Sequence, residues 1–144
     1  MIDLSKFDKS NFTNEPFAKK VLKPWGFEII FTPQDLPYTG KIIHINAGKR
    51  LSLQVHDKKQ ESWILLRGRG KVIWENSTEE LIETELEAEK GYTCKIGQRH
   101  RLAGITDCDI LEVSTPEIGT TYRLEDDYRR PDETEEMRAE EREK

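Results

Sequence analysis

The sequence lacks several features that define common protein classes. Its 144 residues contain only two cysteines, Cys94 and Cys108, without the spacing of a zinc knuckle. We therefore expect two free buried thiols, with a disulfide as the alternative. No apolar run approaches the ~18 residues of a membrane-spanning helix, and the first residues include acids instead of the apolar segment of a secretory signal. These absences favour a cytoplasmic protein with no membrane partner.

An excess of positive charge is also absent. The net charge is −5, and residues 125–144 alone hold ten acidic and five basic residues, so residues 1–124 are neutral. Pairs such as Lys58-Lys59 and Arg129-Arg130 are isolated, whereas phosphate contacts need clustered lysine and arginine. We expect no nucleic-acid partner.

Apolar residues are scarce for a globular domain, at 35% of the chain, which indicates that part of the chain is solvated. Residues 1–23 have the texture of an arm, in which Phe7, Phe12 and Phe17 could pack on the body of the protein or cross to a second copy in a homodimer. We expect the barrel domain to span residues 24–124 and an acidic tail to follow at residues 125–144.

The central part of the chain has the pattern of a β-protein. Short segments rich in β-branched and aromatic residues alternate with turns, and eight of the nine glycines fall at or near the segment ends. Short strands at this spacing, with no helical period, predict an all-β antiparallel sandwich or barrel. The predicted strands are Phe27–Thr32, Lys41–Asn46, Leu51–His56, Glu61–Leu66, Lys71–Glu75, Leu81–Leu86, Tyr92–Ile96, Arg101–Ala103, Asp109–Val113 and Thr121–Leu124.

The tail has the pattern of a short charged helix. Asp132 is a good N-cap and is followed three residues later by Glu135. The residues beyond are good helix formers but almost none is apolar, Met137 being the main exception. Such a helix is exposed to solvent, lies along a partner or frays.

Four residues could hold a metal ion. In the segment 50–56, alternation places Gln54 and His56 on one strand face, opposite the apolar residues. A hairpin would bring Glu61 next to them, and His100 follows a glycine turn farther along the chain. Two imidazoles, a carboxylate and an amide oxygen suit Zn²⁺, or Mn²⁺, Fe²⁺ or Ni²⁺. The alternative is a polar face in contact with water.

Other polar and aromatic residues have structural interpretations. His44 alternates with Ile43 and Ile45, and we expect it to be a hydrogen-bonded structural histidine and not a metal ligand. The three tryptophans, Trp25, Trp63 and Trp74, are expected in the core or at its rim, with sugar stacking as the alternative.

Two segments resemble the motifs of the cupin superfamily. The run 48–63, together with Gly68, resembles the first cupin motif in the version found in phosphomannose isomerases, and the spacing from Glu61 to Gly68 is reproduced. The run 91–102 resembles the second motif, with His100 at its histidine position. The resemblance implies a single cupin barrel, a double-stranded β-helix or jelly roll.

The flanking segments are similar to those of one group of isomerases. Residues 23–28 resemble the beginning, and residues 121–128 the end, of the isomerase domain at the C-terminus of bifunctional phosphomannose isomerase/mannose-1-phosphate guanylyltransferases. The resemblance implies metal-dependent interconversion of mannose 6-phosphate and fructose 6-phosphate. The nucleotidyltransferase domain is absent, so guanylyltransferase activity is not expected.

The resemblance also implies roles for individual residues. Gln54, His56, Glu61 and His100 match the metal ligands of the stand-alone isomerases, and Arg123 lies in a Thr-Tyr-Arg segment whose arginine lines their active site. Arg123 would stabilise an enediolate or bind phosphate. Lys58 is a candidate proton-transfer group, or a salt-bridge partner of Glu61, or solvent-exposed. Further phosphate-binding candidates are Arg50, Arg99 and Arg101.

Two departures from the motifs support a second interpretation. Lys58 replaces the second histidine of the first motif, and the turn before His100 is two residues shorter and lacks a proline. The alternative function is therefore a non-catalytic cupin that binds a sugar phosphate or sugar nucleotide and regulates a separate enzyme. A third hypothesis is another metal-dependent reaction of cupins, such as that of an oxygenase.

Overall fold

The computed structural model describes residues 1–143; Lys144, the last residue of the predicted tail, lies outside the described part. Most elements are strands, namely β1 (Lys19–Lys23), β2 (Gly26–Ile30), β3 (Thr39–Ile45), β4 (Leu53–His56), β5 (Glu61–Arg67), β6 (Gly70–Glu75), β7 (Leu81–Glu85), β8 (Gly91–Cys94), β9 (His100–Gly104), β10 (Cys108–Ser114) and β11 (Thr121–Glu125). A 3-10 helix, η1 (Leu4–Lys6), precedes them, and the helix α1 (Glu135–Glu143) follows them.

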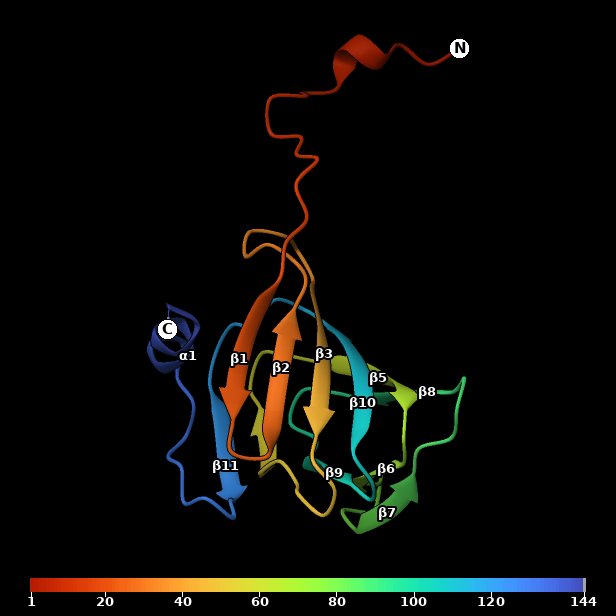
Figure 1. Ribbon diagram of the computed structural model, residues 1–144, viewed down its shortest axis with the longest axis vertical. Coiled ribbons are helices and arrows are strands. Elements are labelled where there is room, and N and C mark those ends of the chain that lie inside the picture. The colour runs from red at the N-terminus through yellow and green to blue at the C-terminus, as the bar shows by residue number, and fades with distance from the viewer. Residues whose placement is uncertain (144) are drawn as a thin grey trace.

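The strands form two antiparallel sheets that enclose a common interior (Figure 1). One sheet has the order β1-β2-β3-β10-β5-β8 and the other the order β11-β4-β9-β6-β7. Strands adjacent in each sheet are often distant in sequence, as in the pairing of β4 with both β9 and β11. The predicted all-β architecture with a short C-terminal helix is confirmed.

All ten predicted strands are present, with ends shifted by no more than two residues. The strand β1 was not expected, because residues 19–23 were assigned to the arm. This segment pairs in register with β2, but Val21 is its only buried residue. With three lysines among five residues, it shows no apolar alternation that would predict a strand.

The residues before β1 extend away from the barrel (Figure 1). Phe7 and Phe12 are exposed, so the arm does not pack on its own barrel through them. Phe17 is partly exposed and lines a surface pocket with Ile30 and Pro116 of the barrel. Crossing of the arm to a second copy remains a prediction.

The apolar core lies between the two sheets and follows strand alternation. On β3, Ile43 and Ile45 point inward and are almost fully buried, and they pack with other core residues such as Trp63. Both cysteines are free and buried, as predicted. Trp25 is likewise a core residue.

His44 has the structural role expected of it. It lies on β3 between the two buried isoleucines, and its ring stacks on Phe27 with centroids 4.7 Å apart. Its Nδ1 lies 2.6 Å from a carboxylate oxygen of Asp109.

The helix α1 begins later than predicted. Thr134 is its N-cap, since its hydroxyl accepts a hydrogen bond from the Met137 amide at 3.2 Å. The carboxylate of Asp132, the predicted cap, accepts instead from the backbone amide of Arg123. Residue 133 is held to β11 by two backbone hydrogen bonds with Thr121. The tail is therefore fastened to the barrel before the helix starts.

Gly68 ends β5 with a left-handed backbone, at a φ angle of 77°. A Cβ atom at this position would lie only 2.1 Å from the backbone oxygen of Asp107. The glycine shared with the first cupin motif thus has a steric reason to be glycine.

We expect Gly68→Ala to lower the free energy of unfolding by about 1–3 kcal/mol, because a side chain there adds a backbone clash to an unfavourable φ angle. Urea denaturation would measure the change. Gly91→Ala is the matched control, since nothing lies within 4 Å of a Cβ at that position. Equal stability losses in the two variants would contradict this account.

Candidate metal centre and polar cavity

The polar face of β4 points into the barrel, as alternation predicted. Ser52 and His56 are buried, and both line an internal cavity together with Gln54. The hydroxyl of Ser52 donates a hydrogen bond of 2.7 Å to the amide oxygen of Gln54. This face is therefore turned into the barrel, with Ser52 and His56 buried and Gln54 half-buried, which argues against the alternative of a solvated polar face.

Three predicted ligands meet at one point inside the barrel. His56 ends β4, Glu61 begins β5 and His100 begins β9, and one ligand atom from each lies within 4.8 Å of the others. The Oε1 atom of Glu61 is 2.9 Å from Nε2 of His100 and 3.4 Å from Nε2 of His56. We call these three residues the His–Glu–His cluster.

The side-chain amide nitrogen of Gln54 lies next to this cluster. Its Nε2 lies 3.4 Å from Nε2 of His56, and its Cα is paired with that of His100 across the sheet. Half a turn of the amide group would bring its oxygen to this position. The structure thus places all four predicted ligands side by side.

Hydrogen bonds orient both imidazoles. Nδ1 of His100 lies 2.8 Å from the carbonyl oxygen of Gln98, and because a carbonyl can only accept, this nitrogen carries a proton. Nδ1 of His56 pairs with the hydroxyl of Thr121 at 2.9 Å. In both rings it is therefore Nε2 that faces Glu61.

The cluster is buried, and its protonation is shifted. Burial lowers the pKa of His56 to about 4. For His100, burial opposes protonation, but contacts with Cys94 and Glu61 outweigh it and raise the pKa to about 10. Burial would raise the pKa of Glu61, but the Lys59 ammonium and both imidazoles hold it well below its usual range. Without a metal, the site is one ionised carboxylate compensated by a proton on His100 and by Lys59.

These residues fit a divalent ion. Nε2 of His100 is buried and has no well-aligned hydrogen bond among the described residues, although the Glu61 carboxylate is near. A cation between the three donors would satisfy that nitrogen and replace its proton. Imidazole and carboxylate ligands suit zinc and other first-row divalent ions.

The lysine beside the cluster is Lys59 and not Lys58. Lys58 is exposed, whereas the Nζ atom of Lys59 is buried 2.9 Å from Oε2 of Glu61. Of the three alternatives given for Lys58, the structure thus shows the solvent-exposed one. The turn between β4 and β5 decides which of the two adjacent lysines faces inward.

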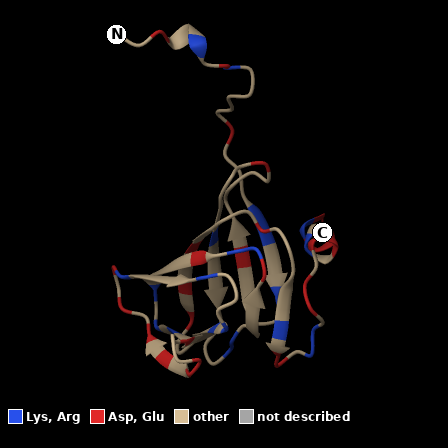
Figure 2. Cartoon of the chain, turned by 180° about the vertical axis from the view of Figure 1, so that it is seen from behind, with Lys and Arg blue, Asp and Glu red and all other residues tan. Residues whose placement is uncertain are grey.

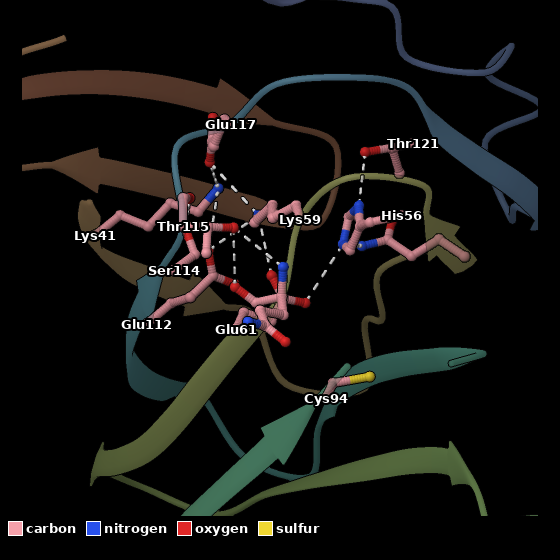
Figure 3. Close-up of polar contacts among 12 residues, drawn as sticks. Lys41, His56, Lys59, Glu61, Cys94, Glu112, Ser114, Thr115, Glu117 and Thr121 are labelled. Carbon is pink, nitrogen blue, oxygen red and sulfur yellow. Dashed lines mark hydrogen bonds and ion pairs between the residues drawn. The ribbon is translucent and has the colours of Figure 1, made fainter. Parts of the chain in front are cut away.

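A chain of alternating charges leads from the cluster toward one end of the barrel (Figure 3). Lys59 lies 3.2 Å from Glu112, whose other oxygen accepts from the indole nitrogen of Trp63 at 3.0 Å. Lys41 lies 2.9 Å from Glu28 and 2.7 Å from Glu117. We call Lys59, Glu112, Lys41, Glu28 and Glu117 the charge chain.

Burial and mutual attraction act on the pKa values of the charge chain in opposite directions. Burial and the charge of Glu61 raise the pKa of Glu112. Burial would lower the pKa of Lys41, but Glu28 and Glu112 more than offset it and raise it. Lys41 is therefore a fixed cation, and Glu112 accepts a proton more readily than Glu28, for which burial would raise the pKa but Lys41 lowers it.

The cavity is small and mostly charged. It has a volume of about 60 Å³. Its far end is lined by the tail, whose Glu133 pairs with Lys23 and Arg123 of the barrel and with Arg138 of α1. The charged side chains that line the cavity are Lys23, Glu28, Lys41, Lys59, Glu112, Glu117, Arg123, Arg130, Glu133, Arg138, Glu141 and Arg142.

Among the predicted arginines, only Arg123 lines this cavity. Arg50 pairs with Asp127 at the surface, and Arg99 contacts Glu75. Arg101 is buried elsewhere, with its Nε donating to the carbonyl of Leu51. The structure therefore does not bring Arg50, Arg99 or Arg101 to the candidate site.

Several cavity residues were missed by sequence reasoning, although some gave a signal. Lys41 is in phase with the buried Ile43 and Ile45 on β3, and Glu112 is in phase with Ile110 on β10. A charged residue in phase with buried isoleucines predicts a charge inside the barrel. Lys23 and Arg138 gave no such signal, because their positions depend on contact between distant segments.

Comparison with known proteins agrees with this architecture. Residues 10–133 match the family model described as mannose-6-phosphate isomerase C-terminal. No curated protein sequence matches the chain significantly. No helix in the described part of the chain has the length and apolar character to cross a membrane.

Solved structures of cupins share the fold. Oxalate decarboxylase from Lactobacillus farciminis is 19% identical, with a TM-score of 0.67 over 81% of this chain and 38% of that chain. The Bacillus subtilis enzyme is 17% identical, with a TM-score of 0.66 over 81% and 34%. KdgF from Halomonas sp. is 12% identical, with a TM-score of 0.57 over 66% and 83%. The chain thus spans little more than a third of the decarboxylases, and the likeness concerns the fold.

The His–Glu–His cluster predicts that the protein binds a metal ion and that binding depends on His56 but not on His44. We expect the purified protein to contain about one divalent ion per chain, and His56→Ala to lose it, because the remaining donors bind too weakly. Elemental analysis by mass spectrometry would measure this. His44→Ala is the matched control, since His44 lies away from the cluster. Equal metal content in the two variants would contradict the assignment.

Glu133 predicts a pH dependence of stability. Burial would raise its pKa, but neighbouring cations, Lys23 foremost, outweigh burial and lower the pKa from 4.5 to about 2. The contribution of Glu133 to stability is therefore complete above its pKa in the unfolded chain. It is lost as the pH falls toward its pKa in the folded protein. We expect Glu133→Gln to be less stable than the wild type near neutral pH.

Urea denaturation at a series of pH values would follow the difference in free energy of unfolding between these two proteins. The difference should shrink as pH falls from 4.5 to about 2. A difference that stays constant over this range would show that Glu133 is not held ionised by its neighbours.

Proposed function

The chain belongs to the mannose-6-phosphate isomerase C-terminal family, and on this basis we propose that it is a metal-dependent aldose–ketose isomerase of the mannose 6-phosphate/fructose 6-phosphate type. The observation that carries the proposal is the His–Glu–His cluster, whose His56 lines one cavity with Lys59 and Glu112. Zinc is the proposed ion. The Mn(II) centres of Bacillus subtilis oxalate decarboxylase, which shares the fold, support metal binding by such a barrel.

The reaction moves one proton from C2 to C1 and another from O2 to O1, through an enediol. A bound divalent ion would polarise the sugar oxygens as a Lewis acid. Glu112 is the proposed base for the carbon-bound proton, because burial raises its pKa toward the range useful for proton transfer. The same carboxyl group then returns the proton to C1.

Lys59 is the proposed partner of the sugar hydroxyls. Its ammonium lies between Glu61 at 2.9 Å and Glu112 at 3.2 Å. It can therefore donate a proton to O1 of the sugar and take one from O2, and its charge stabilises negative charge on either oxygen. Lys59 thus takes the role that the sequence suggested for Lys58.

Arg123 is proposed to contact the anionic part of the substrate. Its guanidinium is largely buried and lines the same cavity as Gln54. The two residues are paired between strands β4 and β11. A guanidinium binds phosphate oxygens with paired hydrogen bonds. The substrate would then extend from the His–Glu–His cluster toward the mouth of the barrel.

A coupled assay for mannose 6-phosphate conversion tests the proposal. We expect the metal-loaded protein to turn over, and Lys59→Met to reduce kcat by at least about 100-fold, the usual contribution of a proton-transfer group. Lys58→Met is the matched control and should retain activity, because Lys58 is exposed. Absence of turnover across a panel of hexose phosphates would refute the isomerase proposal.

A second function is favoured by the small size of the cavity. A volume of about 60 Å³ holds only a few water molecules, which is compatible with a non-catalytic cupin that binds a sugar phosphate or sugar nucleotide and regulates another enzyme. Binding of mannose 6-phosphate without turnover would support this function.

Assembly and location are also proposals. The extended arm with its exposed phenylalanines suits exchange between two copies in a homodimer. Two free cysteines suit a reducing compartment such as the cytoplasm.

A further inference from the structure

The mouth of the barrel holds a carboxylate among three cations. Oε1 of Glu133 lies 3.0 Å from Nε of Arg138, and its Oε2 lies 3.2 Å from the guanidinium of Arg123 and 3.9 Å from Nζ of Lys23. The side chains of the three cations are at most 9% exposed. We call Lys23, Arg123, Arg138 and Glu133 the mouth cluster.

Glu133 alone does not satisfy these cations. The Nε of Arg123 is buried and has no hydrogen-bond partner among the described residues. Lys23 recruits a second carboxylate, Glu141 of α1, at 2.6 Å. A group with more oxygen atoms than a carboxylate, and with a second negative charge, would match three cations better. A phosphate monoester has both.

The mouth cluster and His56 of the His–Glu–His cluster line the same cavity. Gln54 and His56 line it together with Lys23, Arg123, Glu133 and Arg138. Residue 133 pairs with Thr121, which pairs with His56. Adjacent strands lie about 4.8 Å apart, so the backbone of residue 133 is on the order of 10 Å from that of His56. An open-chain hexose phosphate spans a comparable distance.

The tail that brings Glu133 is held by polar contacts. The only buried residue of α1 is Arg138, which donates to the backbone oxygen of Glu117 at 2.8 Å, and Arg142 pairs with the carboxylate of Glu117. Acidic and basic residues both occur along the helix (Figure 2). Such contacts exchange with another anion more readily than a packed apolar face does.

We propose that Lys23 and Arg123, assisted by Arg138, form a subsite for the phosphate group of the ligand, and that Glu133 occupies it as an internal counter-ion until the ligand displaces it. The proposal rests on the proposed class of ligand but requires no catalysis. It also explains how a cavity too small for a sugar phosphate admits one, because the displaced carboxylate and its segment of the tail vacate the mouth.

Calorimetric titration of the full chain with inorganic phosphate tests the subsite without metal or turnover. We expect Glu133→Gln to bind phosphate at least about fivefold more tightly than the wild type, because the competing charge is removed. Glu141→Gln should give a smaller gain, and Lys23→Met should weaken binding. Glu136→Gln, which removes an exposed charge from the same helix, is the matched control and should bind as the wild type does.

Mannose 6-phosphate and mannose extend the test. Mannose 6-phosphate should show the gain in Glu133→Gln, whereas mannose should show none, because it carries no phosphate. The proposal is overturned if neither Glu133→Gln nor Glu141→Gln binds phosphate more tightly, if Glu136→Gln gains equally, or if no variant binds phosphate. Circular dichroism would confirm that each variant is folded. Absence of isomerase activity with an intact Glu133 effect would refute only the proposed reaction.

Discussion

The buried carboxylate of Glu61 is the constraint on which the interior of this barrel depends. An ionised carboxylate without partners inside a protein is destabilised by several kcal/mol. Here it is compensated by two imidazoles and by Lys59. Lys59 in turn needs a second carboxylate, Glu112, which lies beside Lys41. One buried charge near the centre thus requires a continuous series of opposite charges that ends at the mouth of the barrel.

The tail completes this series. Glu117 receives Lys41 from the barrel and Arg142 from α1, so the interior charge chain and the helix share one carboxylate. A helix with almost no apolar side chains has little reason to dock on a β-barrel through the hydrophobic effect. It is placed here by ion pairs that are partly or fully buried, which are less screened than pairs in water. The tail is therefore part of the cavity and not an appendage.

The sequence allowed prediction of the barrel and of the ligands on its strands. Strand alternation placed Gln54 and His56 on one face, and the expected hairpin added Glu61. His100 was proposed from its place after a glycine turn, and the motif resemblance agreed with all four candidates, which lie together in the structure. The choice between Lys58 and Lys59 could not be predicted, because a tight turn follows no alternation. The position of Arg138 depends on a contact with Glu117, 21 residues earlier, which no local pattern encodes. Local periodicity therefore predicts residues within strands, while turns and docked termini depend on tertiary contacts.

The same charge compensation determines how an anion can bind. A ligand that simply entered the cavity would add negative charge to an interior already balanced by its own carboxylates. A ligand that replaces a carboxylate leaves the balance almost unchanged. Its affinity then reflects how much better the cations of the mouth cluster bind the ligand than they bind Glu133. A phosphate dianion brings one negative charge more than Glu133, and the buried Nε of Arg123, which has no hydrogen-bond partner among the described residues, is a donor for its additional oxygen. Selectivity for the charge of the ligand would thus follow from the balance of charges in the mouth cluster.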